Sequence, residues 1–184
     1  MEQLMSEIFK NADNTSATGK DFDVIIIGAG FAGMYMLHRM REMGLKSIVF
    51  EAGDGVGGTW DWNRYPGARC DVESVQYSYQ FDKELEQEWT WSEKYSPQPE
   101  ILKYANHVAD RFKLRKDIRF STRITSSNYD EKKAEWEVVA EQGDTYRSNF
   151  CIFATGCLSS YNLPKFEGIE DFSGATYHTG QWPH

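Results

Sequence analysis

The sequence predicts an α/β fold in three layers, with a parallel sheet into which an antiparallel β-meander is inserted. Three observations carry this prediction. An apolar, β-branched run over 22–27 is followed by a glycine-rich turn, a helical pattern and a second apolar strand. Apolar and polar residues alternate between 118 and 141, as they do in antiparallel strands with one buried face. A further apolar run, 150–154, then returns to the parallel sheet.

The first crossover is the strongest of these signals. The run 22–27 fits a strand covered on both faces, and Gly28 breaks it. Apolar residues then recur at helical spacing until Gly44, and a short apolar strand follows over 47–51. Strand, helix and strand within about 30 residues form a βαβ unit, so we expect parallel strands and a right-handed crossover.

The middle of the chain is less regular. Residues 52–71 predict a long loop rich in Gly, Trp and Arg, and long ordered loops are usually functional. The pattern over 74–81 fits a short strand or a short helix equally well. Apolar residues from Ile101 onward mark one face of a helix that ends near Arg115.

The meander is predicted from two alternating runs, 118–125 and 136–141. A turn at 143–144 leads into a third strand over 145–149, and 150–154 is interpreted as a separate buried run of the parallel sheet.

Charge excludes several classes of partner. The 184 residues carry 20 Lys plus Arg against 28 Asp plus Glu, a formal net charge of −8. An acidic chain without a basic block is poorly suited to nucleic acid or an anionic membrane surface, so we expect neither as a partner.

No apolar run approaches the roughly 18 residues that a membrane helix needs. The hydrophobic share of 40% is enough for a packed core.

The three cysteines, Cys70, Cys151 and Cys157, are odd in number and lack metal-ligand spacing. We therefore expect reduced thiols, a cytoplasmic protein and no metal site. Residues 1–20 are polar and lack the basic start and apolar middle of a secretory signal, so they are interpreted as a flexible leader.

The turn after the first strand has the pattern G-x-G-x-x-G, from Gly28 through Gly30 to Gly33, with Phe31 and Ala32 between the last two glycines. In Rossmann-like folds the first glycine allows the tight turn. The second lets the backbone approach a pyrophosphate, and the third lets the helix pack closely. The helix N-terminus adds free N–H groups and a positive dipole end. Strand, turn and helix together predict a dinucleotide site.

An acidic residue stands where the second strand ends. Glu51 lies 18 residues after Gly33, where a carboxylate can accept hydrogen bonds from both ribose hydroxyls of a dinucleotide. The same carboxylate would repel a 2′-phosphate. This position therefore favours FAD or NAD over NADP.

A second glycine-rich stretch, Gly55-Val56-Gly57-Gly58-Thr59-Trp60, follows near the same strand end. Two adjacent glycines there can approach a pyrophosphate from its other side. The stretch from Glu51 to Trp60 resembles the FAD-binding start of glutathione-reductase-like flavoproteins. The segment Ala154-Thr155-Gly156 resembles a strand end found later in them. The resemblance favours FAD over NAD.

Two longer motifs narrow the resemblance to the Baeyer–Villiger monooxygenases. The stretch Gly58 to Asp71, GTWDWNRYPGARCD, is similar to the family's Gly-x-Trp, Tyr-Pro-Gly, Asp loop. The stretch Phe172 to Pro183, FSGATYHTGQWP, matches its signature of Phe, Gly, His, Trp and Pro at fixed offsets. Together with the glycine motifs, the resemblance runs from about Phe22 to His184.

Members of that family are NADPH-dependent flavoproteins. Their reduced FAD captures O2 as a C4a-peroxide that inserts an oxygen atom beside a ketone carbonyl. The resemblance therefore implies FAD and NADPH as cofactors, a ketone and O2 as substrates, and an ester or lactone as product. Most of the chemistry belongs to the cofactor.

The resemblance also assigns site residues. Asp71 carries over as the catalytic carboxylate beside the family's active-site arginine, whose charge and position it would fix. The alternative is a loop carboxylate that caps the turn after Gly67, and the resemblance favours the catalytic role. Arg64 and Arg69 each have two interpretations: a guanidinium fork on phosphate or NADPH, or a surface salt bridge with a nearby acid.

Trp60 and Tyr77 are candidates for packing against the flavin, although large aromatic side chains more often belong to a core. The complete set of expected cofactor-binding residues is Gly28, Gly30, Phe31, Ala32, Gly33, Glu51, Gly58, Thr59, Trp60, Arg64, Asp71, Tyr77, Ile124, Thr155 and Gly156.

The expected organisation is a leader over 1–20, the N-terminal part of an FAD-binding domain over 21–165, and a signature segment over 166–184. The signature segment leads to an NADPH-binding domain that this sequence does not include. His178 belongs to that segment, where a hinge or backbone-anchoring role is expected rather than proton transfer. The remainder of the polypeptide is then a partner of this chain.

Two alternatives stay open. An N- or S-oxygenating flavin monooxygenase is the nearest, and the Asp71 loop favours ketones over it. A non-catalytic dinucleotide-binding module belongs to a different class. It predicts a complete, stable fold, whereas the monooxygenase hypothesis predicts exposed apolar surface where further polypeptide would pack.

Overall fold

A computed structural model describes residues 21–183, so the predicted leader lies outside the described residues. The described chain forms one mixed sheet with the strand order β3-β2-β1-β6-β5-β4. The strands are β1 (Phe22–Ile27), β2 (Ser47–Phe50), β3 (Ile118–Arg119), β4 (Ile124–Asp130), β5 (Glu135–Ala140) and β6 (Thr145–Phe153). The α-helices are α2 (Phe31–Glu42), α3 (Thr59–Trp62), α4 (Lys83–Glu88) and α5 (Gln98–Arg111).

The parallel half of the sheet contains the predicted crossover. Strand β1 pairs in parallel with β2 on one side and with β6 on the other, so that Ile25 lies between Ile48 and Cys151. Helix α2 connects β1 to β2, which confirms the βαβ unit. Its last turn carries Arg39 and Arg41, which suits the negative end of the helix dipole.

The sequence-based strand boundaries are wrong in the middle of the chain. The predicted strand 118–125 is two strands, because Ser121 adopts a positive φ of 50° and the chain turns there. Strand β3 therefore pairs in parallel with β2, whereas β4 begins the meander. The predicted strands 145–149 and 150–154 are one continuous strand, β6. Its first part pairs antiparallel with β5 and most of its length pairs parallel with β1.

The interpretation of 150–154 as a buried run is also wrong. Phe150 and Phe153 are 43% and 57% exposed. The helix contacts concentrate on β1 and β2, because α2 packs over those two strands. An apolar run predicts that a strand belongs to the sheet, but its burial depends on where the helices lie.

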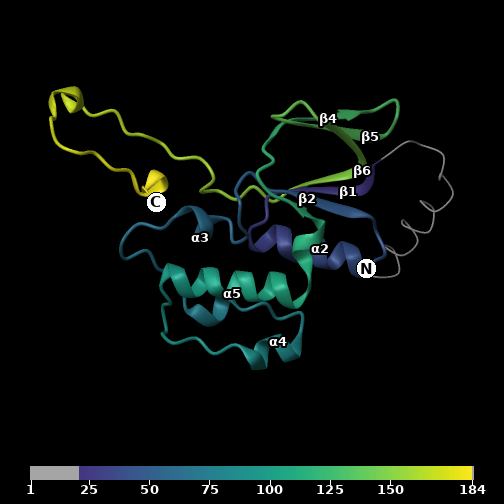
Figure 1. The fold of residues 1–184 in the computed structure, drawn as a ribbon, viewed down its shortest axis with the longest axis horizontal. Helices are drawn as coiled ribbons and strands as arrows, with labels where there is room; N and C mark the ends of the chain where they lie inside the picture. The colour runs from purple at the N-terminus through teal and green to yellow at the C-terminus, as the bar shows by residue number, and fades with distance from the viewer. Residues whose placement is uncertain (1–20, 184) are drawn as a thin grey trace.

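Two cores cover opposite faces of the sheet, as the alternation of side chains along β1 requires. Val24 and Ile26 pack with Leu37 of α2 and with residues of α5. Ile25 packs on the other face with Val138 of the meander. Figure 1 shows these layers, with α2 and α5 on one side of the sheet and the curled β4–β5 hairpin on the other. This arrangement confirms the predicted three-layer α/β fold.

The helical segments differ from prediction mainly at their ends. Helix α5 begins at Gln98 and ends at Arg111, and a 3-10 turn continues to Asp117. Helix α4 was not predicted from the sequence. The Asp82 carboxylate accepts a hydrogen bond from the Leu85 backbone N–H at 2.8 Å, and Leu85 is buried against α5. The undecided segment 74–81 contains a 3-10 helix, Ser74–Tyr77.

The chain after β6 leaves the sheet as an extended segment (Figure 1). Between 158 and 183 it forms two short 3-10 turns, and its large apolar side chains are exposed: Phe166, Phe172 and Tyr177 are 60–63% exposed. Within residues 21–183, no helix has the length and apolar character to cross a membrane. The same residues contain no group of three or more metal-ligand side chains.

Candidate functional site

The first glycine turn is shaped by contacts within the chain at two of its three glycines. Gly28 has a φ of +103°, and a Cβ there would lie 2.7 Å from the Ala154 carbonyl oxygen. A Cβ on Gly33 would lie 1.9 Å from the Gly28 carbonyl oxygen. Both positions therefore exclude any side chain. These glycines close the β1–α2 turn and bring α2 against the end of β6.

Gly30 differs from its two neighbours. Its φ of −72° is open to any residue, and the atom nearest to a Cβ added at this position would be the Gly58 Cα at 3.5 Å. The fold therefore does not require glycine here as it does at Gly28 and Gly33. A bare backbone at Gly30 leaves room for a ligand to approach the turn.

Helix α2 presents an uncapped N-terminus at the same place. Gly30 is its N-cap, no side chain caps the helix, and its first turn contains no acidic residue. The backbone N–H groups of Phe31, Ala32 and Gly33 precede the first intrahelical donor, which is Met34 N–H to the Gly30 carbonyl at 3.0 Å. This is the arrangement that binds anions at helix N-termini.

The second glycine stretch packs directly on the first. The Gly57 N–H donates to the Ala29 carbonyl at 3.1 Å, and a Cβ on Gly58 would lie 2.9 Å from the Gly30 Cα. Thr59 begins α3 immediately after this contact. Two turns that are 28 residues apart in the sequence thus meet on bare backbone, with Gly30 and Gly58 at the contact.

Glu51 connects the first glycine turn to the backbone that directly follows β2. Its carboxylate is buried, with Oε2 accepting from the Ala29 N–H at 2.6 Å and Oε1 from the Gly53 N–H at 2.8 Å. A carboxylate has about four lone-pair sites, so roughly two remain for other donors. Glu51 therefore holds the first glycine turn against the backbone at Gly53 and keeps the capacity to accept from ribose hydroxyls.

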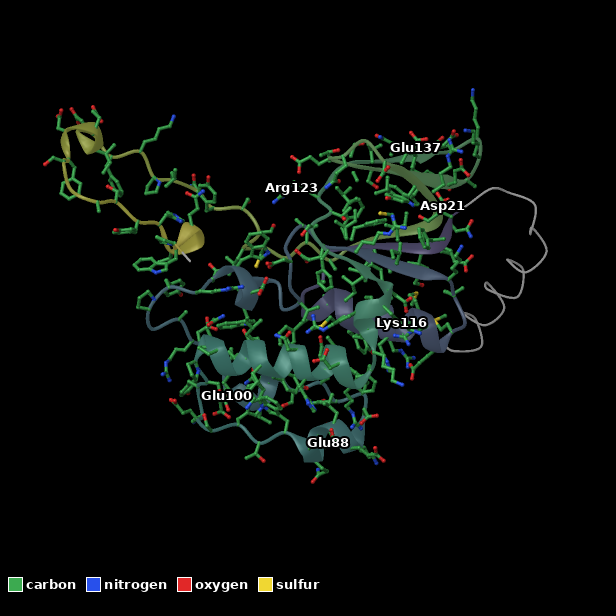
Figure 2. All side chains as sticks on the ribbon, in the orientation of Figure 1. Asp21, Glu88, Glu100, Lys116, Arg123 and Glu137 are labelled. Carbon is green, nitrogen blue, oxygen red and sulfur yellow. The ribbon has the colours of Figure 1, made fainter. Side chains whose placement is uncertain are left out.

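The carboxyl ends of β1 and β2 lie at the same end of the sheet. Figure 2 places Asp21, which precedes β1, at one end of the sheet and Arg123, which precedes β4, at the opposite end, where β1 and β2 finish. Ile124 begins β4 there and is half-buried. Thr155 lies beside the first glycine turn, 3.6 Å from the Cβ position of Gly28, and Gly156 is exposed with a φ of +70°.

The predicted aromatic residues, Trp60 and Tyr77, pack with Phe31 in the first turn of α2. Tyr77 is half-buried, with its ring edge-on to Phe31 at 5.6 Å and to Trp60 at 5.4 Å between centroids. Burial is the main cause that raises the Tyr77 pKa. Phe31, Ala32, Tyr35 and residues 76–81 line a cavity of about 690 Å³. Trp60 is only 8% exposed and packs in a core with Cys70 and Ile101.

The two arginines of the loop each contact an acid. The Arg64 guanidinium donates to the Asp61 backbone carbonyl at 2.6 Å and to the Asp61 carboxylate at 2.8 Å. Arg69 forms an ion pair with Glu93 at 2.8 Å, as its salt-bridge interpretation describes. Burial raises the pKa of the Asp61 carboxyl, and the Arg64 charge opposes that rise.

Asp71 is exposed and follows the buried Cys70. It belongs to the same loop as Tyr77 but lies outside the contact between the glycine turns. In the C-terminal segment, His178 Nδ1 accepts from the Gly180 N–H at 3.1 Å, a local cap of a 3-10 turn that fits a backbone-anchoring role.

Sequence reasoning missed two residues at this site. Gly53 donates to Glu51, and a Cβ on it would lie 3.0 Å from the Trp62 ring. Trp62 itself is 44% exposed. The signal was present in the spacing, because Trp60 and Trp62 are two apart on a short helix and therefore face different sides.

The chain matches the pyridine nucleotide-disulphide oxidoreductase family over residues 25–184. It belongs to that family. It is 46% identical over 172 residues to a Baeyer-Villiger monooxygenase of Pseudooceanicola batsensis, covering 93% of this chain and 32% of that relative. It is 47% identical over 163 residues to phenazine N-monooxygenase PhzNO1 of Lysobacter antibioticus, covering 88% of this chain and 30% of that relative.

Solved structures of monooxygenases are also similar to this chain. A solved structure of oxidized steroid monooxygenase bound to NADP is 57% identical, with a TM-score of 0.82, and the match covers 89% of this chain and 31% of that one. The chain thus spans about a third of the length of the relatives it matches. The resemblance to Baeyer–Villiger monooxygenases, predicted from the motifs, is confirmed.

Proposed function

We propose that this chain is the FAD-binding N-terminal part of an NADPH- and O2-dependent Baeyer–Villiger monooxygenase that converts ketones to esters or lactones. The observation that carries the proposal is the contact between the two glycine turns at Gly30 and Gly58, beside the uncapped N-terminus of α2. The similarity to enzymes of that name supports the same conclusion.

The residues present fit a dinucleotide. The N–H groups of the first turn of α2 would bind the diphosphate, because they lack an acidic neighbour and a side-chain cap. Glu51 would accept from the ribose hydroxyls while still accepting from the Ala29 and Gly53 N–H groups. A buried carboxylate disfavours a 2′-phosphate, so we assign FAD rather than NADPH to this turn.

The aromatic cavity beside Phe31 and Tyr77 suits a flat, apolar ring system, since its lining is largely aromatic. Bound FAD supplies the redox and oxygen chemistry that side chains cannot provide. Asp71 would act on this side as the carboxylate that holds a cationic partner contributed by the remainder of the polypeptide. We assign 21–165 to the FAD-binding domain and 166–184 to the segment that leads to the NADPH-binding domain.

The cytoplasmic location remains part of the proposal, supported by three cysteines that are all free thiols. Arg64 is proposed to contact phosphate or NADPH with the part of its guanidinium that Asp61 does not engage.

The test is a product analysis on the full-length protein that carries this chain. We expect bound FAD, NADPH oxidation that requires O2, and an ester or lactone from at least one member of a panel of cyclic, linear and aryl ketones. Consumption of NADPH and O2 with no ester from any ketone would contradict the proposal.

One observation favours a second candidate. The phenazine N-monooxygenase is as similar to this chain as the Baeyer-Villiger monooxygenase of Pseudooceanicola batsensis. An N-oxygenating enzyme is therefore compatible with this part of the protein. Aromatic N-heterocycles included in the same panel separate the two, because N-oxide without ester identifies the second activity.

A further inference from the structure

Two segments without regular secondary structure, 68–74 and 93–98, pair with each other, and the second ends in the first residue of α5. Three backbone hydrogen bonds connect them, donated by Gln98 to Ala68, by Cys70 to Ser96 and by Ser74 to Lys94, at 2.8, 3.1 and 2.8 Å. Helix α5 buries one face in the core. The 68–74 segment, which carries Asp71, is therefore held against a rigid element of the fold.

The Ser74 hydroxyl is a buried connection between the two segments. Ser74 is 2% exposed and Ser96 is fully buried. The Ser74 Oγ atom accepts from the Ser96 N–H at 2.8 Å, and it lies 2.8 Å from both the Ser96 hydroxyl oxygen and the Glu93 carbonyl oxygen. A hydroxyl has one hydrogen to donate and two lone pairs, so it can satisfy these three contacts at once. Alanine at this position would leave buried polar groups of the 93–98 segment without this partner, which is costly.

The charged contacts between the same segments are exposed. Arg69 pairs with Glu93 at 2.8 Å and Lys94 pairs with Glu73 at 2.9 Å, with side chains that are 47–65% exposed. Exposed ion pairs contribute little to stability, because water screens them and their long side chains lose freedom. The buried hydroxyl of Ser74, rather than these ion pairs, therefore fixes how the two segments lie.

Asp71 lies between two of the attachment points. It directly follows Cys70, whose N–H donates to the Ser96 carbonyl, and it precedes Ser74 by three residues. The Asp71 side chain is exposed, and among residues 21–183 it has no hydrogen bond or ion pair. The backbone that carries Asp71 therefore sets where its carboxylate lies. A charge-assisted hydrogen bond from a cation needs a donor–acceptor distance of about 2.7–2.9 Å, so a small shift of this backbone would weaken it.

We propose that Ser74 is a positioning residue for Asp71. Its hydroxyl fixes the 68–74 segment on Ser96 and Glu93, so that the Asp71 carboxylate is held where its cationic partner meets it. This inference rests on the proposed function, in which Asp71 holds that partner, and adds to it a buried residue outside the cofactor-binding set. Because Ser74 acts on the rate only through Asp71, substitutions at the two positions should be non-additive.

The experiment compares Ser74→Ala and Ser74→Thr with the unaltered, FAD-loaded full-length protein. Threonine keeps the hydroxyl and alanine removes it. The kcat for ester formation is measured at saturating NADPH with the best ketone of the panel, together with the FAD content and the unfolding midpoint. Ser148→Ala is the matched control, because Ser148 is also fully buried and its hydroxyl donates to the Phe150 carbonyl at 2.9 Å, within β6.

We expect Ser74→Ala to lower kcat by about ten-fold or more, since a misplacement of about 1 Å can cost as much as a hundred-fold in rate. The FAD content should not change, and Ser74→Thr should retain most of the activity. Ser148→Ala should lower the unfolding midpoint as Ser74→Ala does, but it should leave kcat unchanged. Loss of a buried hydroxyl then costs stability at both positions and rate at only one.

A double-mutant cycle with Asp71→Ala separates positioning from a general structural role. Asp71→Ala alone should lower kcat by more than Ser74→Ala does. Adding Ser74→Ala to Asp71→Ala should then change the residual kcat by less than about two-fold. If Ser74→Ala does not fold, Ser96→Ala takes its place in the cycle, because it removes one of the three contacts and keeps the Ser96 N–H. Its loss of kcat should be smaller and should likewise disappear in the Asp71→Ala protein.

Four results would overturn the inference. A kcat that is unchanged in the variant used for the cycle refutes the positioning role and leaves the proposed function intact. An equal loss in the presence and absence of Asp71 shows that Ser74 does not act through it. A loss that Ser148→Ala shares, or that Ser74→Thr does not restore, shows a general effect of instability. An unaltered protein that forms no ester from any ketone refutes the proposed function, and the inference with it.

Discussion

The first crossover and the C-terminal signature segment both carry sequence motifs but lie in opposite environments. Ile25, Leu37 and Val49 of the crossover are fully buried, whereas Phe166 and Phe172 near the C-terminus are more than 60% exposed. Figure 1 shows the same contrast, with β1, α2 and β2 in the body of the fold and the C-terminal segment extending away from it. Packing within the described chain thus explains the identity of motif residues in the crossover. It does not explain the identity of motif residues in the signature segment.

The two motifs are retained for different physical reasons. In the crossover, Gly28 and Gly33 are needed because side chains would strike backbone atoms of the same chain. In the signature segment, the described residues offer the aromatic side chains little to pack against. Its motif therefore reflects contacts other than those of the chain's own core, which agrees with the proposed position of the segment at a domain junction.

The largest change in stability is expected from a substitution within the first crossover. Gly33→Ala places a methyl group 1.9 Å from the Gly28 carbonyl oxygen, so α2 must move away from the sheet. We expect a loss of unfolding free energy of about 3 kcal/mol or more, measured by urea denaturation, or failure to fold. Gly44→Ala is the control, since it has a positive φ but nothing within 4 Å of the added carbon, and should cost only about 1–2 kcal/mol. Equal costs would contradict the steric explanation.

The second prediction compares burial in the two regions directly. Leu37→Ala removes a fully buried side chain and should cost about 2–5 kcal/mol of unfolding free energy. Phe172→Ala removes a larger side chain that is 61% exposed and should change that free energy by no more than about 0.5 kcal/mol. Both are measured on the 184-residue chain by denaturant unfolding. A cost above about 2 kcal/mol for Phe172→Ala would show that the segment packs on the fold.

The third prediction separates ligand binding from folding within the crossover. Alanine at Gly30 fits the backbone and meets only the Gly58 Cα at 3.5 Å, so the unfolding free energy should change by no more than about 0.5 kcal/mol. The added methyl group stands between the two glycine turns. It should weaken FAD and ADP binding by about ten-fold or more, or 1.4 kcal/mol, in calorimetry. Unchanged affinity would mean that the diphosphate does not approach Gly30.

The smallest effect concerns His38 on α2, whose ring lies between Phe81 at 4.5 Å and Phe112 at 4.8 Å. Burial lowers its pKa, although the neighbouring Glu42 opposes the shift. The neutral form is therefore favoured in the folded state. The stability it contributes is complete above the unfolded pKa of about 6.5 and is lost as the pH falls toward the folded value.

His38→Gln should accordingly reduce the loss of unfolding free energy between pH 7 and pH 5, measured by urea denaturation at each pH. His107→Gln is the matched control on α5, because the His107 side chain is 36% exposed against 16% for His38. A pH dependence that is unchanged in His38→Gln and reduced in His107→Gln would contradict the assignment.

Much of the fold was predictable because the sequence features that indicate it are local. The β-branched run of β1, the glycines of the turn and the apolar spacing of α2 are each set by neighbours within a few residues. The split between β3 and β4 was not predictable, since it depends on Ser121 turning where its N–H reaches the Gly53 carbonyl, 68 residues away in the chain. Helix α4 was missed because its one buried apolar residue gives no periodicity.

A glycine turn, a helix N-terminus and an acid at dinucleotide-binding spacing were predictable without coordinates, because each depends on residue types at short, fixed separations along the chain. The contacts between these features could be seen only in three dimensions: Gly58 rests on Gly30, Glu51 accepts from both Ala29 and Gly53, and Trp62 rather than Trp60 is exposed. Close approach between distant segments depends on how the whole sheet and its helices pack, and no local pattern specifies it.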